Sequence, residues 1–213
     1  MNKSNSIFNE IVTNIIAGVL KPRERLVERD LIDKFGASRT PIREAIQRLE
    51  TIGLVQTIPN KGAIVIEFFP KDVENLYLVR IPLECLAAKL AFPNLGIVEI
   101  EKLQEINYQL QTFLNTSGLL QKIEKDKQFH LTICNASQNK FLIQIIQDLR
   151  LKCYTVAYYA WADPNRVKAS VFEHGEMIKA LKERNKVKFQ KWVKHQLVSS
   201  KKAYLEYLRR IQP

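Results

Sequence analysis

The stretch Arg39-Thr-Pro-Ile-Arg-Glu-Ala-Ile-Gln-Arg-Leu-Glu50 has the pattern of an amphipathic helix. Its apolar residues recur at helical spacing and form one stripe: Ile42, Ala45, Ile46, Leu49 and Ile52. Ser38 suits the N-cap, because a Ser hydroxyl accepts a free backbone N–H of the first turn. Pro41 falls within that turn, and Gly53 falls just past the end, where a left-handed residue closes many helices. The stretch therefore predicts a helix that begins after Ser38 and ends before Gly53.

The opposite face of this helix carries side chains suited to a DNA groove. At about 100° per residue, Thr40, Arg43, Glu44 and Gln47 point away from the apolar stripe, and Arg39 lies at the near edge. Arg binds guanine bidentately or clamps a phosphate, Gln reads adenine, and Thr serves either role. An ordinary surface helix with scattered charges has the same pattern. The choice between a DNA-binding helix and a surface helix therefore depends on the segments that flank this stretch.

Two further helices are predicted before this stretch. Apolar residues at helical spacing predict the first over residues 7–19, with Ser4 or Ser6 as its cap. Residues 27–35 predict the second, and Gly36-Ala37 makes a tight turn from it into Ser38. Two helices joined by such a short turn are typical of a helix-turn-helix.

A β-hairpin is predicted after this stretch. Residues 54–58 and 63–67 are rich in β-branched side chains and predict two strands, which Pro59-Asn-Lys-Gly62 connects. The tip of this hairpin, Lys61 and Gly62, would reach a phosphate or the minor groove, since Gly lets the backbone approach closely. Three helices followed by a hairpin predict a winged helix-turn-helix.

The rest of the chain predicts an all-α antiparallel bundle. Six amphipathic stretches follow one another: 71–91, 97–114, 118–136, 139–161, 165–183 and 186–210. Their short connections imply antiparallel neighbours. We therefore expect a mainly α protein with a DNA-binding domain over residues 1–68 and a helical domain over residues 69–213.

The composition is that of a globular protein, but the distribution of charge does not identify which part of the chain binds DNA. The net charge is +11, but residues 1–67 carry ten Lys and Arg against eight Asp and Glu. No apolar run approaches the roughly 18 residues of a membrane span. Three cysteines and no recognisable signal peptide favour reduced thiols and a cytoplasmic location.

Because one recognition helix makes few contacts with DNA, we expect a homodimer that binds a short inverted repeat.

The histidines of the helical domain suggest a metal site. Asp126 and His130 are four residues apart and project from one face of a helix, while His174 and His195 lie in the last two helices. Three imidazoles and a carboxylate that meet in a bundle core suit Zn²⁺ or a similar ion. The same residues are also compatible with three unrelated histidines, because only one pair is local in sequence.

The N-terminal part resembles the GntR-type bacterial transcription regulators. The similarity is carried by Leu20-Lys-Pro-Arg-Glu-Arg-Leu-Val-Glu-Arg-Asp-Leu31, by Phe35-Gly-Ala-Ser-Arg-Thr-Pro-Ile-Arg-Glu-Ala-Ile-Gln-Arg-Leu-Glu50 and by Gly53-Leu-Val55, and it covers about residues 7–67. The resemblance implies DNA contacts from Arg29, Arg39, Thr40, Arg43, Lys61 and Gly62. Arg29 enters through this resemblance alone.

The C-terminal part resembles the FCD ligand domain of the FadR branch. Arg80-Ile-Pro-Leu-Glu84, Asp126-Lys-Gln-Phe-His130, Glu173-His174 and a His at position 195 match that domain, and six helices suggest its VanR-type subgroup. The resemblance implies that Asp126, His130, His174 and His195 bind a divalent metal, with Zn²⁺ the first choice and Ni²⁺ or Mn²⁺ acceptable. It also implies a small organic-acid effector that completes the coordination.

Arg80 could pair with that effector or with Glu84, which follows four residues later in the chain. We favour the Arg80–Glu84 pair.

The combined pattern predicts a metabolite-responsive transcription regulator, with repression the more common mode in such families. A metal-dependent hydrolase that uses the Asp and three His is the alternative, although no His-Glu-x-x-His motif occurs. A second alternative is a structural protein that binds nucleic acid and has no ligand, but this alternative does not explain the histidines.

Overall fold

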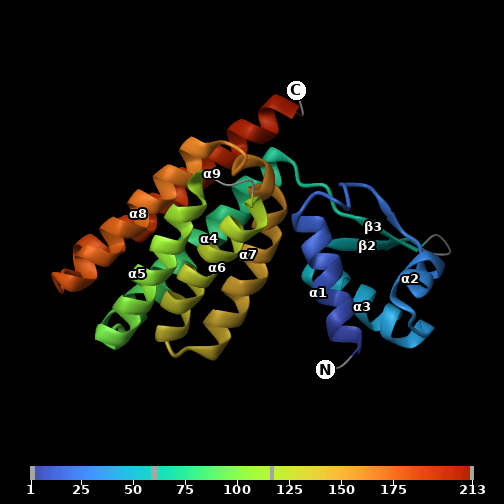
Figure 1. Cartoon of the computed structure of the whole chain (residues 1–213), viewed down its shortest axis with the longest axis horizontal. Helices are drawn as coiled ribbons and strands as arrows, with labels where there is room; N and C mark the ends of the chain where they lie inside the picture. Colours follow the sequence, from blue (N-terminus) through green and yellow to red (C-terminus); the bar gives the residue numbers. More distant parts are fainter. Residues whose placement is uncertain (1–2, 59–61, 116–117, 212–213) are drawn as a thin grey trace. The chain divides into compact units, whose positions relative to one another are not determined.

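The structure, a computed structural model, describes residues 3–58, 62–115 and 118–211 and divides into two compact units. The first unit comprises Met1–Phe68 and the second Phe69–Pro213. Figure 1 shows helices and a small sheet in the first unit and a bundle of long helices in the second. No helix within the described ranges is both long and apolar enough to cross a membrane.

The first unit is a helix-turn-helix with a small antiparallel sheet. Its elements are α1 (Lys3–Ile16), β1 (Arg25–Leu26), α2 (Glu28–Phe35), α3 (Arg39–Ile52), β2 (Val55–Ile58) and β3 (Gly62–Val65). Helix α3 packs against α1 through the predicted stripe, of which Ile42, Ala45, Ile46 and Leu49 are buried. Gly53 closes α3 in a left-handed conformation as expected, and Gly36 closes α2 in the same way.

Two predicted caps are not formed. Ser38 is the N-cap of α3, but its hydroxyl makes no capping hydrogen bond in the structure. Helix α1 begins at Lys3, ahead of the predicted cap, so that Ser4 lies buried inside the helix. Neither cap is needed for these helices to form, because tertiary packing of an amphipathic face supplies most of the stability of a helix in a protein.

The sheet has a third strand that the sequence did not predict. Its strand order is β1-β3-β2 with both pairs antiparallel, and β1 is only two residues long. Gly62 opens β3 at a φ of +83°, and a Cβ on it would come within 2.7 Å of the Leu26 carbonyl oxygen. Glycine is therefore required at position 62 by the packing of β1 on β3. Lys61 lies outside the described residues.

The second unit is a bundle of long helices close to the predicted stretches. They are α4 (Pro70–Ala91), α5 (Ile97–Thr112), α6 (Leu119–Ala136), α7 (Lys140–Ala160), α8 (Pro164–Lys182) and α9 (Lys186–Ile211). Short 3₁₀ turns, Phe92–Asn94 and Phe113–Asn115, follow α4 and α5. Helix α4 starts at Pro70, where the Asp72 carboxylate accepts the Phe69 backbone N–H at 2.9 Å.

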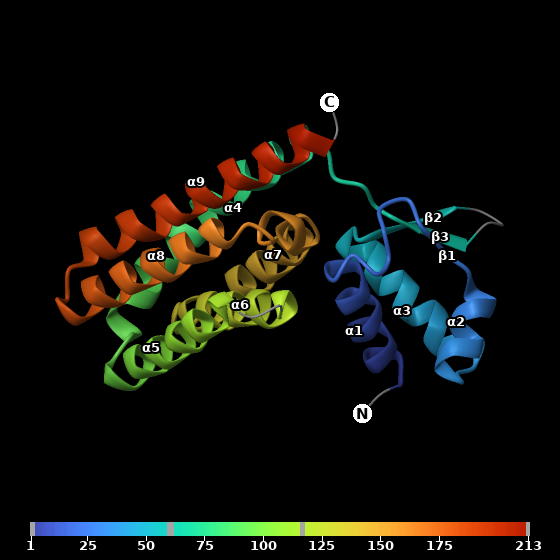
Figure 2. The same cartoon turned by 45° about the horizontal axis from the view of Figure 1, so that its top comes forward.

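The packing of these helices leaves a polar interior around α6. Helix α4 packs along α9 and also contacts α6 and α7, while α5 contacts both α6 and α8 (Figure 2). Cys134 of α6 is buried in an apolar cluster with Ala87, Leu142 and Ile146, and burial raises the pKa of its thiol to about 12. Cys134 is therefore a core residue, as expected. The same helix also carries buried polar residues, Asp126 and His130 among them.

Candidate functional site

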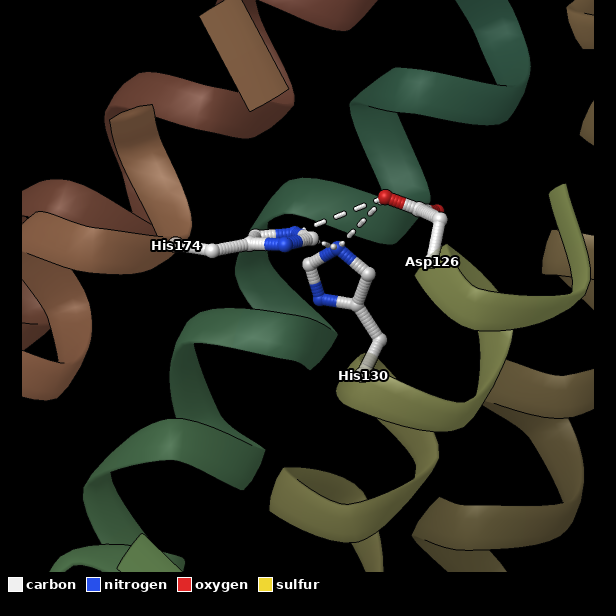
Figure 3. A group of neighbouring side chains, drawn as sticks. All are labelled: Asp126, His130 and His174. Atoms are coloured by element: carbon white, nitrogen blue, oxygen red, sulfur yellow. Dashed lines mark hydrogen bonds and ion pairs between the residues drawn. The ribbon is translucent and has the colours of Figure 1, made fainter. Parts of the chain in front are cut away.

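Three predicted ligands meet in the interior of the bundle. Asp126 and His130 project from α6 and His174 from α8, and their polar atoms point toward one another (Figure 3). The Asp126 Oδ1 lies 3.4 Å from His130 Nε2 and 3.5 Å from His174 Nε2. The two Nε2 atoms are 3.4 Å apart. All three side chains are buried, and His174 is fully inaccessible to solvent.

The triangle of these atoms has the size that a small divalent ion requires. In a tetrahedral site with bonds of about 2.0–2.1 Å, neighbouring ligand atoms are roughly 3.3–3.4 Å apart. The three observed separations of 3.4–3.5 Å match this value. Two imidazoles and one carboxylate are also a donor set that suits Zn²⁺ and related ions. The residues present therefore fit a metal with at least one open position.

Asn107 of α5 fixes which nitrogen of His174 is free for an ion. The Asn107 side-chain amide N–H donates to the Val171 carbonyl at 3.1 Å, which turns its Oδ1 toward His174. That oxygen lies 3.2 Å from His174 Nδ1, so Nδ1 carries the proton and donates it. The lone pair of Nε2 then points at the other two ligands. Such outer contacts orient metal-binding histidines and raise their basicity.

The electrostatics favour the protonation states that metal binding needs. Burial, together with the positive charge of Arg150, lowers the pKa of His130 from 6.5 to about 4, so its imidazole is neutral at pH 7. Burial alone would raise the pKa of Asp126, but His130 and His174 outweigh it and hold this pKa well below its usual range. The site thus presents a neutral imidazole at His130 and an ionised carboxylate at Asp126, which are the ligand forms of these residues. Phe129 stacks on the His174 ring at 3.7 Å between centroids and shields it from water.

A small cavity of about 20 Å³ borders this group, with room for about one water-sized group. Asp126 and His130 form part of its wall, and Arg80 and Arg150 line it as well. Both arginines are held by Glu84: Arg80 Nη2 lies 2.8 Å from its Oε1, and Arg150 binds its Oε2. The Arg80–Glu84 pair that we favoured from the sequence is therefore present, and Arg80 also faces the cavity.

Several buried polar atoms of residues that line the cavity have no hydrogen-bond partner among the described residues. They are the Tyr77 hydroxyl, Arg150 Nε, Trp161 Nε1 and Gln196 Oε1. Buried polar groups are normally satisfied, and each unsatisfied one costs roughly 1–3 kcal/mol. Three of these atoms are N–H or O–H donors beside two arginines. The cavity therefore suits a polar, anionic group.

His195 does not join the three ligands in this structure. Its side chain on α9 is 55% exposed, and its Nε2 lies 3.8 Å from Glu173 Oε1. The ring stands edge-on to Trp192 and within 3.4 Å of the Ser199 hydroxyl oxygen. The expected convergence of four ligands is thus reduced to three, because Glu173 and Trp192 hold the imidazole at the surface of α9. Glu173 in turn accepts a hydrogen bond from Arg166 at 2.8 Å and is no free base.

The outer face of α3 presents the predicted DNA-reading side chains. Arg39, Thr40, Arg43 and Gln47 are exposed, as is Arg29 on α2. The Arg43 Nε binds both carboxylate oxygens of Glu28 at 3.0 Å, which holds the guanidinium at the α2–α3 junction. Arg48 has a different role, because it lies over the Phe8 ring at 4.2 Å and binds Asn5 of α1.

Glu50 joins the end of α3 to the hairpin. Its carboxylate accepts hydrogen bonds from the Thr57 backbone N–H at 2.8 Å and from the Thr57 hydroxyl at 2.7 Å. These bonds lower the pKa of Glu50, which is fully exposed. They fix β2, and with it the hairpin, relative to the recognition helix. Sequence analysis missed this contact, because seven residues and a turn separate the two partners.

Comparison with known proteins assigns both units. Residues 3–65 match the bacterial regulatory proteins of the gntR family, and residues 75–198 match the FCD domain. The chain belongs to the GntR family of bacterial regulatory proteins. It carries an FCD domain, as its sequence predicted. Its N-terminal unit binds DNA, and its C-terminal unit is of the type that responds to a small molecule.

Its relatives are transcription regulators. The chain is 28% identical to the regulator YdhC of Bacillus subtilis, over 84% of its own length and 80% of that protein. It is 27% identical to McbR of Escherichia coli, over 84% and 82%, and the structure of McbR superposes with a TM-score of 0.85 over the full length of both chains. It is 23% identical to the repressor RspR of Escherichia coli, over 84% and 78%. These relatives are regulators and not hydrolases, so the alternative of a metal-dependent hydrolase has no support.

Asn107→Ala should weaken binding of Zn²⁺ about 10–100-fold, because His174 loses the acceptor that fixes its tautomer. Asn107→Asp should retain tight binding, since a carboxylate accepts the same proton. The measurement is competition with a chelating dye. Gln109→Ala, on the same helix, is the control, because Gln109 contacts Glu105 on the surface. Equal affinities for Asn107→Ala and wild type would show that the amide has no part in the site.

Proposed function

We propose that this GntR-family protein is a repressor that binds a short inverted-repeat operator. A small organic acid, bound at a metal site in the helical unit, controls this binding. The observation that carries the proposal is the triangle of Asp126, His130 and His174 beside a cavity that two arginines line. An ion on these three ligands would keep an open position, and two of the ligands, Asp126 and His130, form part of the cavity wall. A carboxylate could occupy that position and meet the donors around it.

The size of the cavity gives the effector a mechanical role. At about 20 Å³ it holds one small group, so a whole organic acid enters only if the lining side chains move. A ligand that binds one arrangement of the helices better than another shifts the protein toward that arrangement. Arg80 belongs to α4 and Arg150 to α7, so a rearrangement of these side chains would move the two helices.

The most informative experiment is selection of DNA bound by the full chain from a random pool, repeated with Zn²⁺ and a panel of organic acids. The proposal expects a short palindromic sequence to be enriched and at least one acid to abolish that enrichment. Enrichment that no acid changes would contradict the effector role. Absence of any enriched sequence would contradict specific DNA recognition by α3.

Arg39→Ala and Arg43→Ala should each weaken binding to the selected operator by about 1–3 kcal/mol if they contact bases. Both side chains are exposed on the outer face of α3, so the fold should survive. Fluorescence anisotropy with labelled operator measures the loss. Arg48→Ala is the matched control on the same helix, because Arg48 contacts α1. The Arg48→Ala variant should retain operator affinity and have a lower melting temperature. Loss of operator affinity in Arg48→Ala, with unchanged affinity in Arg39→Ala and Arg43→Ala, would refute the assignment of the two faces of α3.

His174→Ala should lose the bound ion and lower the melting temperature of the helical unit, because the ion cross-links α6 and α8. His195→Ala should keep the ion, since the ring of His195 lies beside Glu173 and apart from the other ligands. Elemental analysis after dialysis and thermal unfolding measure both effects. A loss of metal in His195→Ala as large as that in His174→Ala would instead make His195 a fourth ligand. Full metal content in His174→Ala would rule out the site.

An exposed apolar face on α4 and α7 supports the proposed homodimer. On α4, Val79, Leu86 and Leu90 are 37–48% exposed and fall on one side at helical spacing. Helix α7 packs along α4 and exposes Phe141 and Ile145. A contiguous exposed apolar face is unusual on a monomer and typical of an association surface. A second copy of the chain covers such a face in a two-fold dimer.

Leu86→Glu combined with Ile145→Glu should convert the dimer into a monomer, because charges on both helices would be buried without partners. Analytical ultracentrifugation at micromolar concentration measures the change, and operator affinity should fall with it. Val187→Glu is the control, since Val187 is 77% exposed and belongs to a different helix, α9. A wild-type chain that sediments as a monomer, or a double variant that remains dimeric, would contradict the assignment.

A further inference from the structure

A second recess lies between α5 and α8. It has a volume of about 400 Å³, within the range of small-molecule sites. The side chains that matter along it are Gln104, Asn107, Tyr108 and Gln111 of α5 and Lys179 and Lys182 of α8. We call it the α5–α8 groove. The two helices contact each other and lie next to each other in Figure 1.

The charge of the groove is positive and uncompensated. Lys179 and Lys182 are exposed and, within the described part of the chain, have no carboxylate partner. The two acids nearest to them along α8, Glu176 and Glu183, are both engaged by Lys188 of α9, at 3.9 and 3.2 Å. Lysines near the end of a helix interact favourably with its dipole, which accounts for their position but not for the recess between them and α5.

The remaining wall supplies hydrogen-bond donors and open space. The amides of Gln104 and Gln111 and the 63% exposed ring of Tyr108 face the groove from α5. On α8, Gly175 leaves the floor open, because a Cβ built on it would meet nothing within 4 Å. Two lysines three residues apart lie on one face of a helix and can bind two negative charges together. The groove thus combines two cations, neutral donors and room for a small molecule.

Asn107 connects the groove with the ligand triangle. Asn107 lines the groove, while its Oδ1 accepts the proton of His174 Nδ1 at 3.2 Å. A ligand that contacts this amide competes with His174 or with the Val171 carbonyl for its hydrogen bonds. Occupation of the groove would therefore change the orientation and basicity of a metal-binding imidazole without touching the ion.

We propose that the α5–α8 groove is a second ligand site for a small organic dianion, a dicarboxylate or a phosphate ester, and that its occupation changes the metal affinity through Asn107. Such coupling is reciprocal: the metal must change the affinity for the dianion by the same factor. The groove lies apart from the cavity beside Asp126, so this second site does not depend on the effector that we propose there.

The test is isothermal calorimetry on the full chain with inorganic phosphate, glycerol phosphate and succinate, with acetate as the singly charged comparison. Chelated protein is used first, because removal of the metal abolishes coordination of an anion by the ion and leaves the groove intact. We expect one dianion to bind with a Kd below roughly 1 mM and acetate to bind at least about tenfold more weakly. Succinate and glycerol phosphate distinguish a dicarboxylate from a phosphate ester.

Charge-matched variants locate the binding. Lys179→Gln with Lys182→Gln should weaken the dianion at least about tenfold, whereas Lys168→Gln with Lys186→Gln, which removes two exposed lysines elsewhere on α8 and α9, should not. Equal losses in the two double variants would reduce the effect to bulk charge and overturn the site. If none of the dianions binds at a concentration about 10-fold above that Kd limit, the proposed site is overturned as well.

The coupling is measured by titrating Zn²⁺ with and without saturating dianion. In wild type the dianion should shift the metal Kd at least about fivefold, and in Asn107→Ala the shift should vanish while the dianion still binds. A shift that persists in Asn107→Ala, or no shift in wild type, would contradict the coupling through this amide.

Discussion

The buried carboxylate of Asp126 is the group on which the arrangement of the helical unit depends. An ionised carboxylate inside a bundle is costly unless it is paired, and here two imidazoles from α6 and α8 face it at 3.4 and 3.5 Å. His174 is held in turn by Asn107 of α5 and by the ring of Phe129. Three helices are thus positioned around one oxygen atom. A divalent ion at the centre of this group would satisfy all three ligands at once, which explains why a fold of this kind tolerates so polar an interior.

The same interior is the reason why we propose a ligand in addition to a metal. Glu84 holds Arg80 and Arg150 within the bundle, and these arginines leave donors turned toward the small cavity. The hydroxyl of Tyr77 and Nε1 of Trp161 add further donors without partners among the described residues. Such groups are tolerated where binding or switching needs them, since an unsatisfied polar atom in a core lowers stability. In the DNA-binding unit the charges serve a different purpose: Glu28 positions Arg43, and Glu50 positions the hairpin.

Periodicity predicted most of the fold, and local sequence could not predict the contacts between distant residues. The helices of the bundle begin and end within two residues of the predicted stretches, because their apolar patterns and short connections are local signals. Strand β1 was missed, since two residues carry no recognisable pattern. Asp126 and His130 share one helix, so their juxtaposition followed from helical geometry. The place of His174 beside them was left open by its spacing and was favoured by the family resemblance. His195 was expected there too, but the neighbouring Glu173 and Trp192 draw its ring away. Asn107 had no signal, because its contact with His174 spans 67 positions.

The central claim is that the ion at Asp126, His130 and His174 belongs to the switch that controls DNA binding. The direct measurement is the operator affinity of one preparation of the chain in three states: chelated, reloaded with Zn²⁺, and reloaded with Zn²⁺ plus the active organic acid. We expect similar affinity in the first two states and a loss of at least about tenfold in the third, with no effect of the acid on chelated protein. An acid that weakens operator binding equally in chelated and reloaded protein would show that the ion has no part in the switch.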